Sequence, residues 1–242
     1  MKLYDETIQK FQALLGTGQE RSLPLGETDW KDVSDRSMIL RSEMAYELGG
    51  EGFPATGCTV VTADSDLVPE DKITLLGPDL PQIDRDVPYA RIAFVRVTEE
   101  ALGEGQALYQ AIRNLEYTRY HFYPEGFMMR VSASGQKESV RVGREALKRG
   151  LDFTKTGNRM ITAFRRRISV EAVQIFYVTA KEADYPALRQ YAAEAERITK
   201  TIDHIMKTAV MDCGACSLQK VCDEVEGLKA LHFRERRGSS VG

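Results

Sequence analysis

The sequence lacks the features that mark membrane and exported proteins. No apolar run approaches the roughly 18 residues that a membrane-spanning helix needs, and the mean hydropathy is -0.34. The first residues, Met1-Lys2-Leu3-Tyr4-Asp5-Glu6, do not include the apolar stretch of a signal peptide. We therefore expect a soluble, cytoplasmic protein that makes no contact with a membrane.

The chain also lacks a strong net charge and the motifs of common nucleotide-binding enzymes and hydrolases. Its formal net charge is -3, so we expect no binding to nucleic acid. It contains no G-x-S-x-G elbow, no Walker loop and no Rossmann glycine fingerprint. The charge is unevenly spread, however, since eleven Lys/Arg and three Asp/Glu lie between Arg130 and Arg167. This imbalance predicts a basic face suited to an anionic small molecule or an acidic partner.

The sequence does show an alternation of strand-like and helical patterns. Strand-like runs occupy residues 38–40, 43–48, 58–62, 73–76, 91–97, 127–132 and 172–178. Helical patterns occupy residues 3–15, 98–120, 144–149, 158–168 and 186–208. Together they predict an α/β or α+β fold, in which helices flank a mixed sheet and a cysteine segment follows at the C-terminus.

Composition divides the chain into three parts. Residues 1–37 are expected to form an N-terminal helix and a polar, Gly/Pro-interrupted linker. Residues 38–210 carry the strand and helix patterns and are expected to form one α/β domain. Residues 211–242 form a cysteine-rich segment with a basic, then Gly/Ser-rich tail.

Cysteine is scarce but clustered, and the cluster is the sharpest signal in the chain. Three of the four cysteines, Cys213, Cys216 and Cys222, lie within ten residues. A C-x2-C pair allows two thiolates to bind one metal ion or adjacent irons of a cluster. The fourth ligand could come from His232, Cys58, solvent or a partner. The spacing is compatible with an iron–sulfur cluster, with zinc and with unliganded thiols, and we expect Cys58 to be an ordinary buried strand thiol.

Several segments, in order, resemble one family, the β subunit of the CO dehydrogenase/acetyl-CoA synthase complex. The resemblance extends from about Glu43 to Cys222 and includes a strand followed by a G-P-D-hydrophobic-x-Q-I pattern. The segments are Met44–Gly50, Lys72–Ile83, Tyr123–Gly126, Ser134–Lys137, Arg141-Val142 and Ala146–Phe153. They are similar to the middle domain of that family, so the resemblance implies the fold of that domain.

The resemblance also implies a metal centre and partners. In that family the cysteines beyond the middle domain begin a site in which a [4Fe-4S] cluster is bridged to nickel. It implies that Cys213, Cys216 and Cys222 hold a [4Fe-4S] cluster, and the family's last ligand falls near His232. CO dehydrogenase or corrinoid iron–sulfur protein subunits are the implied partners.

Two departures from the family limit what is implied. The second and third cysteines are closer together than in the family, and no cysteine follows Cys222. The C-x-C motif that holds the distal nickel is missing, as are the family's N-terminal and C-terminal domains. We therefore expect a free-standing middle domain without a second nickel clamp.

The resemblance further implies coenzyme A, because the family's middle domain is thought to receive it on an Arg-rich surface. Arginine suits its phosphates because the planar guanidinium binds phosphate oxygens in a bidentate manner. The candidate residues are Gln136, Lys137, Arg141, Arg144, Arg165 and Arg166. The alternative is a solvated basic face in which Glu145 and Arg149 form an i,i+4 pair.

The leading hypothesis is an acetyl-CoA-synthase-like iron–sulfur protein of anaerobic one-carbon metabolism, an acyltransferase that is incomplete as an isolated chain. The alternatives are a non-catalytic iron–sulfur module for electron transfer, assembly or regulation, and a zinc-stabilised binding domain.

Overall fold

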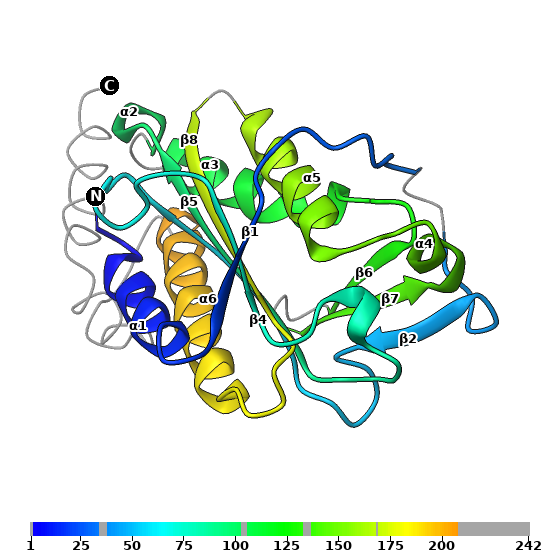
Figure 1. Cartoon of the computed structure of the whole chain (residues 1–242). Helices are drawn as coiled ribbons and strands as arrows, with labels where there is room; N and C mark the ends of the chain where they lie inside the picture. Colours follow the sequence, from blue (N-terminus) through cyan, green and yellow to red (C-terminus); the bar gives the residue numbers. More distant parts are fainter. Residues whose placement is uncertain (1, 34–37, 103–105, 133–136, 168, 208–242) are drawn as a thin grey trace, which may run out of the picture.

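The computed structural model describes residues 2–33, 38–102, 106–132, 137–167 and 169–207 (Figure 1). They form two sheets with helices packed around them, which confirms the α/β class and the mixed sheet expected from the sequence. Within these ranges, none of the helices combines the length and the apolar character that a membrane crossing requires.

The central sheet has five strands in the order β1-β4-β8-β5-β3. The strands are β1 Glu20–Leu23, β3 Ala55–Thr62, β4 Lys72–Leu76, β5 Tyr89–Val97 and β8 Val170–Val178. The pairs β4/β8 and β5/β3 are parallel, whereas β5/β8 and β1/β4 are antiparallel. The inner strands β4, β8 and β5 are buried along almost their whole length, and their sequences are accordingly rich in apolar residues.

Helices cover both faces of the central sheet (Figure 1). On one face lie α1 Asp5–Leu15 and α6 Tyr185–Lys207, where the Phe11 ring packs edge-on against Tyr191 and near Phe94 of β5. On the other face lies α5 Phe153–Arg165, whose first residue stacks on Tyr177 of β8 with ring centroids 4.4 Å apart.

A second, antiparallel sheet lies beside α5 in the order β2-β7-β6 (Figure 1). Its strands are β2 Met44–Leu48, β6 Phe127–Val131 and β7 Glu138–Gly143, and α4 Arg144–Lys148 follows β7 directly. Phe127, Val140 and Val142 are buried toward the core. Since successive strand residues point to opposite faces, Arg130 and Arg141 lie on the outer face.

The remaining helical elements follow β4 and β5. They are α2 Glu99–Leu102, α3 Gln106–Glu116 and the 3-10 helices η1 Leu80–Gln82 and η2 Tyr117–His121. The single helix expected over 98–120 is therefore divided among α2, α3 and η2. The glycines at 103 and 105, which weaken a helix, lie outside the described residues.

Four expectations about secondary structure were wrong. Residues 38–40 lie outside every strand that the structure describes, and Met38 and Leu40 are exposed. The expected linker at 16–37 contains β1, which pairs with β4. The strand β7 was not expected, because Glu138 takes one of its inward positions and interrupts the apolar alternation of Val140 and Val142. Helix α5 begins at Phe153 rather than 158, because the Asp152 side chain accepts a hydrogen bond from Lys155 N and caps it.

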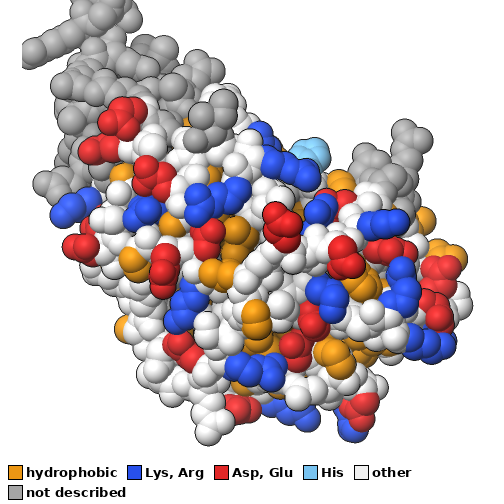
Figure 2. Space-filling model, turned by 45° about the horizontal axis from the view of Figure 1, so that its top comes forward, with side chains coloured by type: hydrophobic (Ala, Val, Ile, Leu, Met, Phe, Trp, Pro, Cys, Tyr) orange, Lys and Arg blue, Asp and Glu red, His pale blue; other side chains and the backbone are white. Residues whose placement is uncertain are grey.

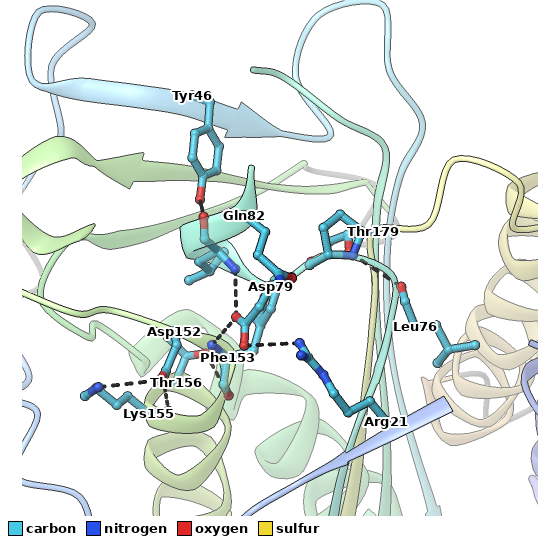
Figure 3. A network of polar contacts seen from close by, with 12 residues as sticks. Arg21, Tyr46, Leu76, Asp79, Gln82, Asp152, Phe153, Lys155, Thr156 and Thr179 are labelled. Carbon is cyan, nitrogen blue, oxygen red and sulfur yellow. Dashed lines mark hydrogen bonds and ion pairs between the residues drawn. The ribbon is translucent and has the colours of Figure 1, made fainter. Parts of the chain in front are cut away.

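The G-P-D-x-x-Q-I segment has a structural role that Figure 3 shows. Gly77 turns the chain with a φ of 109°, and a Cβ there would lie 2.3 Å from the Ala180 nitrogen. The Asp79 carboxylate accepts hydrogen bonds from Leu80 N at 2.7 Å and from Phe153 N at 2.9 Å. One side chain thus joins the end of β4 to the start of α5.

Candidate functional site

Two of the predicted basic residues, Lys137 and Arg141, line one cavity of about 440 Å³ on the outer face of the second sheet. Its other lining residues are Arg41, Glu47, Gly49, Gly50, Glu51, Arg130, Val131, Ser132 and Ser139. Four of the lining side chains are cationic and two are anionic, so the cavity favours an anionic ligand.

Strand register brings the cations of this cavity together. Glu47 of β2 is the register partner of Arg141 in β7, and Arg130 of β6 is the partner of Ser139. Glu47 accepts a 2.6 Å hydrogen bond from Arg130 and lies 3.8 Å from the Arg141 Nε. Glu47 therefore neutralises part of the charge that β6 and β7 contribute.

The guanidinium of Arg141 is held in place by the backbone but keeps a donor without a hydrogen-bond partner among the described residues. Its Nη1 donates to the Ile39 carbonyl at 3.1 Å. Its Nε is buried and makes no hydrogen bond within the described part of the chain. Within that described part, neither Arg41 nor Lys137 forms an ion pair with an Asp or Glu side chain. These three cations keep capacity for a ligand.

A second cavity of about 850 Å³ meets the first at Lys137. It is lined by Phe53, Pro54, Ala55, Thr56, Lys137, Tyr185, Pro186, Arg189, Gln190 and Ala193, none of which is acidic. One wall is the start of β3 and the other is the first turns of α6. Lys137 therefore stands between a small cationic cavity and a larger one with apolar walls.

The other predicted basic residues lie elsewhere. Arg144, at the start of α4, is exposed and donates to the Met44 carbonyl at 3.1 Å. Arg165 ends α5 and pairs with Asp71 at 2.9 Å, just before β4, and Arg166 beside it is exposed. Because α5 begins near Asp79, past the end of β4, Arg165 lies at the opposite end of that strand. Gln136 falls outside the described residues.

The predicted basic face is largely paired with acids inside the chain. The ion pairs are Arg130–Glu47, Lys148–Glu145, Arg149–Glu125, Lys155–Asp152, Arg159–Asp32 and Arg165–Asp71. Arg149 therefore pairs with Glu125, and the expected pair with Glu145 is wrong. In the view of Figure 2, basic and acidic side chains are intermixed across the surface.

A third cavity, of about 860 Å³, has the opposite character. It lies where β4 and β8 end, and includes Leu76, Gly77 and Val178 in its lining. Its charged lining residues are Glu20, Arg21, Glu182 and Asp184. The excess of carboxylates disfavours a phosphate-bearing ligand.

The predicted metal ligands Cys213, Cys216, Cys222 and His232 lie outside the described residues. Three thiolates and an imidazole are donors that suit either an iron–sulfur cluster or zinc. Within the described ranges, no group of His, Cys, Asp and Glu is placed to hold a metal ion. Cys58 is buried in β3, and burial raises the pKa of its thiol to about 12. That agrees with the expected strand thiol and disfavours a metal-binding thiolate.

Sequence reasoning missed three cations of the site, Arg41, Arg130 and Arg189. Arg41 borders a segment that was interpreted as a strand, and Arg189 lies 52 positions from Lys137 on α6. The local sequence offered a signal for Arg130 alone. It lies on a strand whose residues alternate between the two faces of the sheet, and it shares the outer face with Arg141 of the paired strand β7.

Comparison with known protein families identifies a match over much of the chain. A family model described as CO dehydrogenase/acetyl-CoA synthase complex beta subunit matches residues 33–183. A search of curated proteins found no match. The matched range contains the second sheet and the cations Arg41, Arg130, Lys137 and Arg141, and it ends before Arg189.

Proposed function

Because this chain belongs to the family of CO dehydrogenase/acetyl-CoA synthase β subunits, we propose that it binds coenzyme A and acts in acetyl-CoA-synthase-like one-carbon chemistry. The family match covers more than half of the chain. The observation that carries the coenzyme A assignment is the pair of cavities that meet at Lys137.

The two cavities match the two halves of coenzyme A. Its nucleotide carries a pyrophosphate and a 3′-phosphate, which suit the smaller cavity with Arg41, Arg130, Lys137 and Arg141. A volume of about 440 Å³ is too small for the whole molecule. The pantetheine arm then extends past Lys137 into the larger cavity, whose walls include Phe53 and other apolar groups.

The metal centre belongs to the same proposal. Cys213, Cys216 and Cys222 hold a [4Fe-4S] cluster, and His232 supplies the fourth ligand. When bound, the cluster provides the redox-active metal of the site. The chain acts in the cytoplasm of an anaerobic cell with CO dehydrogenase or corrinoid iron–sulfur protein subunits as partners.

Calorimetry with coenzyme A and dephospho-coenzyme A tests the ligand assignment. The wild-type chain is expected to bind coenzyme A several-fold more tightly, because the 3′-phosphate gains charge-assisted contacts. Lys137→Gln and Arg141→Gln should each reduce this preference. Arg165→Gln is the matched control, since Arg165 belongs to the same basic stretch but pairs with Asp71 at the far end of β4.

Two results would contradict the assignment. Equal affinity of the wild type for the two ligands would remove phosphate recognition. A loss of preference in Arg165→Gln, with none in Lys137→Gln, would place the phosphate site at the end of α5 instead.

A further inference from the structure

Glu138, the first residue of β7, is a charged side chain with no exposure to solvent. It meets Arg91 of β5, which is also 0% exposed. Arg91 Nε donates to Glu138 Oε1 at 2.6 Å, and Nη2 donates to Oε2 at 2.8 Å. This bidentate geometry fixes both position and orientation of the carboxylate.

The central sheet has a vacant side-chain position for this carboxylate. Gly57 of β3 is the register partner of Arg91. A Cβ on Gly57 would lie 2.3 Å from Glu138 Oε2 and 2.6 Å from Glu138 Cβ. Position 57 therefore requires glycine, because the Glu138 side chain lies too close for any Cβ. The start of β7 thus lies directly over β3.

Further groups hold the pair in place. Arg91 Nη1 lies 3.4 Å from the Thr59 hydroxyl oxygen, and Arg119 Nη1 lies 3.9 Å from Glu138 Oε2. Burial lowers the pKa of Arg91, but the Glu138 carboxylate raises it further, so the net shift of the pKa is upward. Arg91 is therefore charged at any physiological pH.

Such a pair is poorly explained by stability alone. Removing two charges from water is costly, and apolar residues of similar volume often serve stability as well or better. What the ion pair adds is a fixed location, because a guanidinium fork accepts a carboxylate in few geometries. A fixed Glu138 in turn fixes the direction of the residue next to it in the chain.

The neighbour is Lys137. Successive strand residues point to opposite faces, so an inward Glu138 directs Lys137 outward, to the point where the two cavities meet. The Lys137 carbonyl also accepts a 2.8 Å hydrogen bond from Ser132 N of the adjacent strand end. The backbone of Lys137 is thus held from both sides.

We propose that Arg91 and Glu138 are positioning residues, which set Lys137 against the 3′-phosphate of coenzyme A, the group that dephospho-coenzyme A lacks. This inference rests on the proposed function. It assigns a role in ligand discrimination to a pair of side chains that are fully buried and do not touch the ligand themselves.

The first test is Gly57→Ala, which displaces Glu138 without changing any charge. The measurement is the ratio of the dissociation constants for dephospho-coenzyme A and coenzyme A. That ratio is expected to fall from several-fold toward one, because a charge-assisted contact to the 3′-phosphate is lost. Gly157→Ala is the matched control. Gly157 lies on α5, away from Lys137, and a Cβ there would lie 2.7 Å from the Ile73 side chain of β4. The control should keep the ratio.

A second variant covers the case in which Gly57→Ala does not fold. Arg91→Met combined with Glu138→Met replaces the ions by apolar groups, which buried sites tolerate, and should also lower the ratio. In a Lys137→Gln background neither change should lower it further, since the effect passes through Lys137.

The outcomes separate the two proposals. A wild type without preference for coenzyme A overturns the proposed function and this inference together. A wild type with the preference, and folded variants that retain it, overturns the positioning role alone. Equal losses in Gly57→Ala and Gly157→Ala would also overturn it, because they would show a general effect of core strain.

Discussion

At Asp79 a single carboxylate meets several backbone segments. It caps η1 through Leu80 N, accepts from Phe153 N at the start of α5, and lies 3.5 Å from the Arg21 guanidinium of β1. The Gln82 side-chain oxygen in turn accepts a hydrogen bond from Asp79 N, which completes a capping box. The motif that carries the family resemblance therefore acts here as a structural junction (Figure 3).

Asp79→Ala should lower the free energy of unfolding by about 2 kcal/mol, the upper range for loss of an N-cap, because the nitrogens of Leu80 and Phe153 both lose their acceptor. Thermal melting followed by circular dichroism measures the change. Asp84→Ala is the control, since Asp84 is exposed and pairs with exposed Arg85 in the same loop, and its melting temperature should match the wild type. Equal melting of the two variants would contradict the junction role.

At the scale of elements, the N-terminal segment belongs to the core. The hydroxyls of Tyr4, just before α1, and of Thr199 on α6 are 2.9 Å apart, and β1 pairs with β4 from Glu20↔Leu76 to Leu23↔Ile73. The boundary expected between 37 and 38 stays a prediction. These contacts nevertheless tie the segment before it to the central sheet.

We predict that a fragment of residues 38–242 does not unfold cooperatively, because it loses an edge strand and exposes the faces that α1 covers, including Phe94. Circular dichroism and a thermal melt of the fragment test this. Leu25→Ala in the full chain is the control, since Leu25 is 50% exposed, and it should melt like the wild type. A fragment that melts at the wild-type temperature would show the segment to be an appendage.

At the scale of the whole molecule, two sheets and α6 together form the candidate site. Lys137 and Arg141 come from the second sheet, Thr56 from the central sheet and Arg189 from α6. The cysteine segment follows α6, so the helix that borders the larger cavity also leads toward the proposed cluster ligands.

We predict that chain purified without oxygen carries about four irons and matching sulfide, as a cubane requires. Cys213→Ala, Cys216→Ala and Cys222→Ala should each lose most of the iron, whereas buried Cys58→Ala should keep it. His232→Ala should shift the reduction potential, because an imidazole ligand raises it. Zinc with no iron would replace the cluster by a zinc site.

The same preparation, loaded with nickel, should show no acetyl-CoA synthesis by itself. None of its four cysteines forms a C-x-C pair, so the chain offers no second clamp for nickel. Acetyl exchange assayed with and without partner subunits tests this, and turnover by the chain alone would refute it.

The sequence by itself determined the fold class, the strands β5 and β8, the helix α1 and the family, because apolar periodicity and ordered motifs are local signals. It also identified Lys137 and Arg141 as candidate ligand contacts, through the resemblance. Strand β7 was not predicted, because Glu138 is charged although it lies on the same inward face as Val140 and Val142. The apolar alternation that indicates a strand is therefore interrupted at its first residue.

Only the tertiary structure decided which basic residues share a site. It joined Lys137 and Arg141 with Arg41 and Arg189, and it separated them from Arg165 at the other end of β4. It also supplied Arg91 and Gly57, which lie 47 and 81 positions before Glu138. Register between strands and the packing of α6 create these neighbours, and neither is encoded in the spacing of residues along the chain.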